Sequence, residues 1–243
     1  MPKPAKSVES PKKSSVISMS IGVGLATGLY GISFGALSSA AGLSLWQTQV
    51  LSLAMFSGGS QFALVGVIAA SGPAGMIPAI ISAWLLGIRN GFYALRLNGV
   101  LGVPRALKAI SAQLTIDESN AVSAAQASER DSKLGFWLTG ASVFVFWNSF
   151  TFVGALLGQG LGEPSTWGLD AAAAAAFLGL LWPSLKNLKS NLVALLAVIF
   201  TLAIVPFVPS GIPVIISAPL AVMVVYALAA SKFGSRLNAG EHD

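Results

Sequence analysis

The chain has 243 residues, of which 54% are hydrophobic and 9% are charged, and its formal net charge is +5. A soluble domain usually carries roughly 25% charged residues, so this composition, arranged in long apolar blocks, indicates a polytopic integral membrane protein. The chain has no cysteine and a single histidine, His242, near its C-terminus. These counts exclude disulfides, thiolate chemistry, a histidine metal centre and a histidine-based catalytic triad. Lysines and arginines flank the apolar runs, which is typical of cytoplasmic loops, so we expect neither a nucleic-acid partner nor a cofactor.

Seven apolar segments follow one another, and each approaches the roughly 20 residues that a bilayer crossing requires. They cover residues 16–38, 46–70, 75–97, 134–157, 170–188, 191–208 and 211–230. The sequence therefore predicts an all-α fold with seven to eight transmembrane helices and a transmembrane domain at residues 16–231. A basic, Pro- and Ser-rich tail at residues 1–15 is predicted to be disordered, and a polar tail follows at residues 232–243.

The number of crossings decides on which side of the membrane each tail lies. Basic residues occur in both tails, before the fourth segment and after the fifth. Seven crossings would place the tails on opposite sides, against the tendency of basic residues to stay in the cytoplasm. An eighth embedded segment would remove this conflict, and residues 105–128 are the stretch available for it.

The second apolar segment contains an interruption, Ala54-Met55-Phe56-Ser57-Gly58-Gly59-Ser60-Gln61-Phe62. Glycine weakens a helix interior by about 1 kcal/mol relative to alanine, and in lipid each unsatisfied main-chain group costs several kcal/mol. Broken helices at membrane depth occur where they line a cavity, as at transporter substrate sites. We therefore predict a substrate site at Ser57, Ser60 and Gln61, with main-chain amides freed near Gly58 and Gly59.

The third segment carries a deep cation within Arg89-Asn90-Gly91-Phe92-Tyr93. Arginine at a helix centre costs about 2.5–3.5 kcal/mol on insertion scales, so Arg89 needs a carboxylate, a carbonyl or a route to the interface. Snorkelling explains Arg96, two turns further along, better than it explains Arg89. The guanidinium could bind a substrate carboxylate bidentately, with Asn90 and Tyr93 as neighbouring contacts, or it could pair with an acid of residues 105–128.

Two acids, Asp117 and Glu118, lie in that stretch. If residues 105–128 form one helix, Glu118 lies near the centre of an apolar face and Asp117 at its edge. Acids within an apolar stripe of a membrane protein are candidates for proton transfer or substrate binding, so we assign proton coupling to this pair. An interfacial helix or a loop with solvated acids is the open alternative.

Three further residues of the apolar segments are assigned roles. Trp147 and Asn148 lie in the middle of the fourth segment, and both are candidate substrate contacts. The tryptophan could serve for packing alone, whereas the asparagine needs a buried partner. Asp170 precedes the run 171–176 of alanines, where a carboxylate stabilises the positive end of a helix dipole, and we predict a structural cap.

Small residues suggest a repeat and a packing surface. Gly35-Ala36-Leu37 is followed by Trp46, Phe56 and Gly58, and Gly154-Ala155-Leu156 is followed by Trp167, Phe177 and Gly179. Transporter folds often consist of such repeats, although chance similarity between two Gly/Ala-rich segments is the alternative. The glycines of the first segment recur about every three or four residues, at Gly22, Gly24, Gly28, Gly31 and Gly35. This spacing predicts close helix packing, or else a helix that slides or bends during transport.

Several of these motifs, in this order, resemble the AzlC family over about residues 20–230. They are Phe34-Gly35-Ala36 with Ala41-Gly42-Leu43-Ser44, the run 56–62, Arg89-Asn90-Gly91-Phe92-Tyr93, Ile116-Asp117-Glu118 with Ala121, and Gly168-Leu169-Asp170. The family commonly has histidine after the arginine, whereas Asn90 stands here, which removes a proton-handling group from that position.

The resemblance implies the large subunit of a secondary exporter of leucine, isoleucine, valine or methionine in the cytoplasmic membrane. It also implies a small hydrophobic partner of the AzlD type. In this hypothesis the substrate carboxylate meets freed amides or Arg89, its ammonium group meets Asp117 or Glu118, and its side chain lies among aromatic residues, namely Phe56, Phe62, Trp84 and Phe92. The alternatives are a channel or carrier for another small solute, and a non-transporting membrane scaffold. An intramembrane enzyme is disfavoured, because cysteine is missing and His242 is peripheral.

Overall fold

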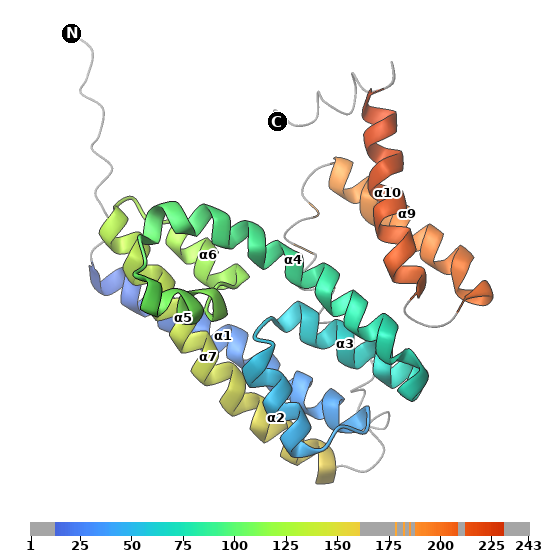
Figure 1. Ribbon diagram of the computed structural model, residues 1–243, viewed down its shortest axis with the longest axis horizontal. Coiled ribbons are helices and arrows are strands. Elements are labelled where there is room, and N and C mark those ends of the chain that lie inside the picture. Colours follow the sequence, from blue (N-terminus) through green and yellow to red (C-terminus); the bar gives the residue numbers. More distant parts are fainter. Residues whose placement is uncertain are drawn as a thin grey trace. The chain divides into compact units, whose positions relative to one another are not determined.

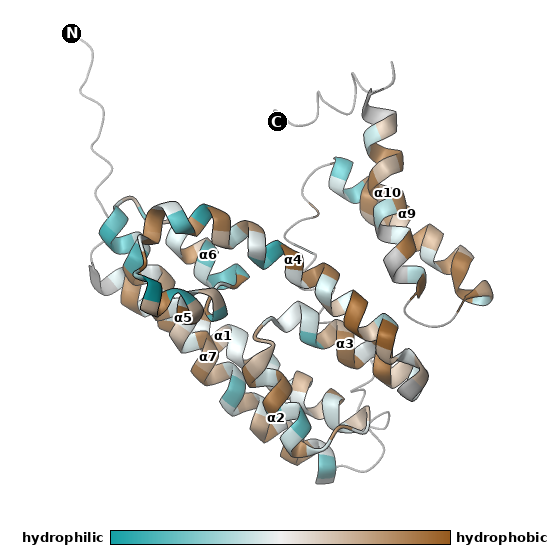
Figure 2. Ribbon diagram, viewed as in Figure 1, coloured by the Kyte–Doolittle hydropathy of each residue, from teal (hydrophilic) through white to brown (hydrophobic). Residues whose placement is uncertain are grey.

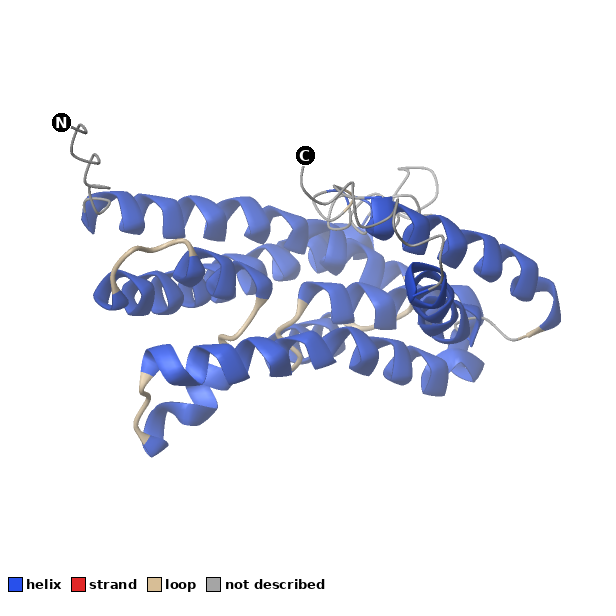
Figure 3. Cartoon of the chain, turned by 90° about the horizontal axis from the view of Figure 1, so that it is seen from above, coloured by secondary structure: helices blue, strands red, loops and turns tan. Residues whose placement is uncertain are grey.

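The computed structural model describes residues 13–160, 178, 182, 185, 188–208 and 212–230. About 90% of these residues are helical and none is in a strand (Figure 3). The elements (Figure 1) are α1 (Lys13–Ala40), α2 (Leu45–Ala54), α3 (Gly58–Ser71), η1 (Gly72–Gly75), α4 (Met76–Leu101), η2 (Arg105–Leu107), α5 (Lys108–Gln113), α6 (Asp117–Ala124), α7 (Glu129–Gly160), α9 (Leu188–Ile204), η5 (Val205–Phe207) and α10 (Ile212–Ala230). The predicted cap Asp170 lies outside the described residues, as do Trp167, Phe177 and Gly179 of the second repeat.

Three helices of the described part are long and apolar enough to cross a membrane: Ser15–Ala40, Glu129–Gly160 and Leu188–Phe207. Large apolar side chains on the helices are exposed to an extent that water would penalise, such as Trp84 at 76% and Leu95 at 76%. Figure 2 shows hydrophilic residues gathered on α5 and α6, whereas α9 and α10 are mainly hydrophobic. The membrane character is confirmed, and the count of seven to eight crossings stays a prediction.

The chain divides into two compact units, and each is described by itself. Unit 1 consists of residues 1–35, 45–57 and 88–156, and unit 2 consists of residues 36–44, 58–87 and 157–243. In unit 2, α9 packs against α10, and the hydroxyls of Thr201 and Ser217 share a hydrogen bond of 2.6 Å between these helices. Unit 1 contains the polar clusters considered below.

Helices α1 and α7 pack side by side in unit 1 and run in the same direction. Thr139 Oγ1 donates to Ser20 Oγ at 3.0 Å near the beginning of both helices. Further along, a β-carbon on Gly35 would overlap the main chain of Thr151 and Ala155. The close packing predicted from the glycines is therefore confirmed for Gly24, Gly28, Gly31 and Gly35, each of which faces α7.

This parallel packing bears on the repeat and on the membrane sidedness. Gly154 follows Gly35 by 119 residues, as Thr139 follows Ser20, and a β-carbon on Gly154 would overlap the main chain of Ile32 on α1. The two Gly-Ala-Leu motifs thus begin at equivalent positions of neighbouring helices, and the repeat itself stays a prediction. The parallel direction also places the basic starts of α1 and α7 at the same end, in keeping with one cytoplasmic face.

Residues 105–128 do not form the one continuous helix that the helical wheel assumed, whereas an eighth embedded segment in this stretch stays a prediction. The stretch forms η2, α5 and α6, with a turn at residues 114–116. Residues of α5 and of the second half of α4 line one pocket, so these two segments are neighbours. Helix α6 runs in the same direction as α4, because Asp117 pairs with Arg89 and Asn120 with Arg96. Ser132 Oγ near the start of α7 donates to the Ser123 carbonyl. Both ends of this α5–α6 hairpin therefore lie at the same end of unit 1.

The local reason for the turn is side-chain competition for main-chain groups. Ser119 Oγ accepts a hydrogen bond from the Ile116 amide at 3.1 Å and donates to the Leu114 carbonyl at 2.7 Å. Ile116 is in extended conformation, with φ −129° and ψ 173°. A serine hydroxyl that satisfies these groups replaces the helical hydrogen bonds and allows the chain to reverse.

The predicted interruption in the second segment is confirmed, because α2 ends at Ala54 and α3 begins at Gly58. The break consists of residues 55–57, and the two glycines form the beginning of α3. The Phe56 ring packs edge-on against Phe144, with ring centroids 5.0 Å apart. Phe144 is in the middle of the 32-residue α7, so the interruption lies at mid-helix depth in unit 1.

The packing makes a prediction about two glycines of α1. Gly35→Ala should overpack the α1–α7 contact and lower the free energy of unfolding by about 1–3 kcal/mol, which shifts Tm by several degrees. Gly22→Ala is the matched control, because no atom lies within 4 Å of its added β-carbon, and it should keep or raise the Tm. Thermal unfolding of both variants in detergent measures this difference. Equal Tm values would contradict the packing described here.

Candidate functional site

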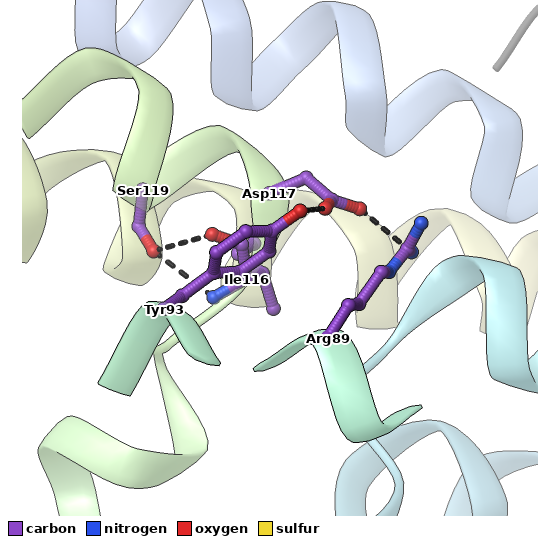
Figure 4. Close-up of polar contacts among 5 residues, drawn as sticks. All are labelled: Arg89, Tyr93, Ile116, Asp117 and Ser119. Atoms are coloured by element: carbon purple, nitrogen blue, oxygen red, sulfur yellow. Dashed lines mark hydrogen bonds and ion pairs between the residues drawn. The ribbon is translucent and has the colours of Figure 1, made fainter. Parts of the chain in front are cut away.

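A charged cluster lies in unit 1 where the α5–α6 turn meets the middle of α4. Arg89 Nη2 lies 2.6 Å from Asp117 Oδ2, and the two side chains are each 32% exposed. Tyr93, one helical turn from Arg89, donates its phenol hydrogen bond to Asp117 Oδ1 at 2.7 Å (Figure 4). Both carboxylate oxygens of Asp117 are therefore engaged from α4. The predicted pairing of Arg89 with one of the acids is confirmed, and the acid is Asp117.

The fold places Asp117 at the first residue of α6, directly after the Ser119-bonded turn (Figure 4). A carboxylate at this position is favoured by the positive end of the helix dipole.

Glu118, the neighbouring acid, has different surroundings. Its half-buried carboxyl accepts a hydrogen bond from the Thr27 side chain on α1. Within the described residues no lysine or arginine forms an ion pair with Glu118. The two adjacent acids are thus distinct: Asp117 is held by a cation, and Glu118 by a neutral hydroxyl.

The cluster also has polar atoms without partners. Arg89 Nε and Asn90 Oδ1 are buried and have no hydrogen-bond partner among the described residues. Leaving such a group unsatisfied costs about 1–3 kcal/mol, and each such group in a native structure calls for an explanation. One unused donor and one unused acceptor, on adjacent residues beside an ion pair, suit a ligand that both accepts and donates hydrogen bonds.

The residues of the interruption belong to both units. Ser57 is buried in unit 1, whereas Gly58, Gly59, Ser60 and Gln61 form the beginning of α3 in unit 2. Gly59, Ser60 and Gln61 are buried there. The first amides of a helix lack intrahelical partners, so the expectation of freed amides at the two glycines agrees with their position in α3. Their role in substrate binding stays a prediction.

Trp147 and Asn148 are buried in α7. Their side chains contact other residues of unit 1. The Trp147 ring stacks on Phe34, with ring centroids 6.1 Å apart. Asn148 Nδ2 donates to the Phe144 carbonyl of its own helix at 2.8 Å, whereas its Oδ1 has no described partner. The side-chain amide nitrogen of Asn148 therefore has the buried partner that the sequence analysis expected, whereas its side-chain oxygen has none among the described residues.

The expected aromatic lining is partly wrong. Phe56 and Phe62 are buried, but Trp84 and Phe92 are 76% and 67% exposed. Their helical spacing on α4 points them outward, so they do not enclose a side chain within this chain.

Sequence reasoning missed Thr27 and Ser119. Ser119 follows Asp117 by two residues, and a hydroxyl at the start of a helix is a recognisable capping signal. Thr27 carried no such signal, because its importance comes from the packing of α1 beside α6.

Taken together, the geometry describes a helical membrane protein with an interrupted apolar segment and a half-buried charged cluster in the middle of α4. The AzlC protein family matches residues 22–161, and the chain belongs to this family. No curated protein and no solved structure matches the chain. The AzlC family is associated with branched-chain amino acid transport and is a transporter family rather than an enzyme family.

The ion pair makes a prediction about stability. Asp117→Ala leaves the Arg89 guanidinium half-buried without a counter-ion, so it should lower the free energy of unfolding more than the double variant Arg89→Ala/Asp117→Ala does. We expect a coupling energy of about 1 kcal/mol in a double-mutant cycle, because both groups retain some solvent contact. Thermal unfolding of the four proteins measures it. Arg96→Ala, at the exposed bond to Asn120, should be additive with Asp117→Ala. Additivity of the Arg89 and Asp117 changes would refute the pairing.

Proposed function

We propose that this chain is the large subunit of a secondary exporter that moves branched-chain amino acids, and methionine, out across the cytoplasmic membrane. The family membership supports the substrate class, and the charged cluster supports binding of a zwitterion. The observation that carries the proposal is the Arg89–Asp117 ion pair with unused polar atoms beside it, at mid-helix depth.

An amino acid can take the place of this ion pair without a change in net charge. Its carboxylate binds the Arg89 guanidinium, including the unused Nε, and its ammonium group binds Asp117. The unused Asn90 Oδ1 accepts a further hydrogen bond from the ammonium group. The exchange keeps every buried charge paired, which matters because an unpaired charge at this depth costs several kcal/mol.

The remaining predicted contacts complete the proposal. The freed amides at Gly58 and Gly59, together with Ser57, Ser60 and Gln61, are further substrate contacts, as are Trp147 and Asn148. Asp117 and Glu118 provide proton coupling. Glu118 is the preferred proton carrier, because a carboxyl held by a hydroxyl can change its protonation without breaking an ion pair.

A small hydrophobic subunit of the AzlD type completes the exporter in this proposal. The exposed aromatic residues of α4, Trp84 and Phe92, support it. Aromatic residues are enriched in interfaces between proteins, and a partner on this face would cover both side chains.

The substrate site is tested by replacing the Arg89 guanidinium with an ammonium group of the same charge. Arg89→Lys keeps the charge but removes the Nε donor and the planar fork, so the leucine concentration for half-maximal transport should rise at least tenfold. Transport is measured as leucine counterflow in proteoliposomes that contain the chain and its partner. Arg96→Lys is the matched control and should behave as the wild type. An unchanged half-saturation in Arg89→Lys would exclude the cluster as the substrate site, and counterflow that does not saturate would favour a channel.

Proton coupling is tested at Glu118. Glu118→Gln preserves the shape of the side chain but cannot bind and release a proton, so we expect leucine efflux to lose its response to an imposed pH gradient. Glu129→Gln is the control, because Glu129 forms an exposed pair with Lys133 within α7. Proton-driven efflux at the wild-type rate in Glu118→Gln would remove this acid from the mechanism.

A further inference from the structure

A second polar cluster in unit 1 lies between α2 and α7, and its members are all neutral. Gln49 Nε2 donates to the main-chain carbonyl of Asn148 at 3.4 Å, and Ser52 Oγ donates to Thr151 Oγ1 at 3.4 Å. These two contacts align one turn of α2 with one turn of α7. Thr48 lies one turn before Ser52 on the same face of α2, and is completely buried.

Three oxygen atoms in this contact have no partner. Thr48 Oγ1, Gln49 Oε1 and Asn148 Oδ1 are each buried, and no described residue donates a hydrogen bond to any of them. The Asn148 residue is 7% exposed and Thr48 is 0% exposed. Neighbouring donors are already committed, because Asn148 Nδ2 binds the Phe144 carbonyl. The contact therefore has surplus buried oxygens, which native proteins avoid unless a bound group satisfies them.

The composition of the cluster selects the class of bound group. Hydroxyl and amide oxygens bind hard cations. No carboxylate is among the three, so the cluster cannot balance the charge of a divalent ion, and among the described residues there is no group of three acids or histidines that could. Helix α2 ends at Ala54, within two turns of the cluster, and the carbonyl end of such a half-helix favours a monovalent cation.

We propose that Thr48, Gln49 and Asn148 form a cation site between α2 and α7 whose occupant is a sodium ion. The main-chain carbonyl of Asn148 is adjacent to Gln49 and supplies a further oxygen. The ion ties α2 to α7 close to the interruption at residues 55–57. This site shares Asn148 with the proposed substrate contacts but contains no residue of the Arg89–Asp117 cluster, and its existence does not depend on which solute the protein transports.

Sodium binding is measured as stabilisation of the purified full-length chain against heat. The Tm is followed in detergent while NaCl replaces choline chloride at constant ionic strength and without amino acid. At a tenfold excess over the half-saturating concentration, a bound ion should raise the Tm by about 3–6 °C. Potassium in place of sodium should give a smaller shift. A Tm that responds to sodium no more than to choline would overturn the proposal and leave an ordered water in the cluster.

Two matched variants test the location. Thr48→Val removes one unpartnered oxygen at constant shape, so it should raise the half-saturating sodium concentration at least tenfold while keeping or raising the Tm in choline. Thr139→Val is the control, because Thr139 is also a buried hydroxyl of α7 but is paired with Ser20 of α1, away from α2. It should lower the Tm in choline and retain the sodium response. Equal sodium responses in the two variants would overturn the assignment.

A third variant keeps the proposal testable if Thr48→Val fails to fold. Asn148→Asp retains the oxygen and adds a negative charge, so sodium should bind at least several-fold more tightly. A half-saturating concentration that does not fall in Asn148→Asp would also overturn the assignment, because a residue with a packing role alone would not respond in this direction.

Discussion

Main-chain groups that lipid cannot solvate are the constraint on which unit 1 depends. Helix α2 stops at Ala54, where its last carbonyls lack helical partners. Gln113 at the end of α5 satisfies them, donating from Nε2 to the Leu53 and Ala54 carbonyls at 2.7 and 3.4 Å. The α5–α6 turn also leaves main-chain groups without helical partners, and the Ser119 hydroxyl forms hydrogen bonds with two of them. Each interruption is therefore stabilised by a side chain that comes from the α5–α6 hairpin.

The parallel pair of α1 and α7 provides the surface on which these interruptions lie. Glycines let the two main chains approach closely, and the same helices then contact the hairpin. Gly140 of α7 would collide with Leu114 if it carried a β-carbon, and Thr27 of α1 faces Glu118. A larger residue at Gly140 would displace the turn that precedes Asp117. The packing of small residues thus determines where the acids lie relative to Arg89.

Sequence reasoning located the interruption, the deep arginine and two adjacent acids, one of which pairs with it, because each violates the preference of lipid for apolar helices. It failed for residues 105–128, where a helical wheel placed Glu118 on an apolar face. The wheel assumes continuous helix, and the Ser119 hydroxyl ends that continuity through contacts that composition does not reveal. The contact of Gln113 with α2 was also beyond prediction, since it joins residues 60 positions apart. Sequence periodicity describes one helix at a time, whereas the Ser119 turn and the Gln113 contact each depend on how two segments of the chain meet.

The hairpin connects two features that sequence reasoning treated separately. Its turn carries Asp117, which pairs with Arg89, while Gln113, four residues earlier, holds the end of α2 beside the interruption. A ligand that separates Asp117 from Arg89 changes the force that holds the turn against α4. The ion pair and the α2 terminus are therefore joined by one short hairpin, so the proposed exchange of a substrate for the ion pair would also bear on the end of α2.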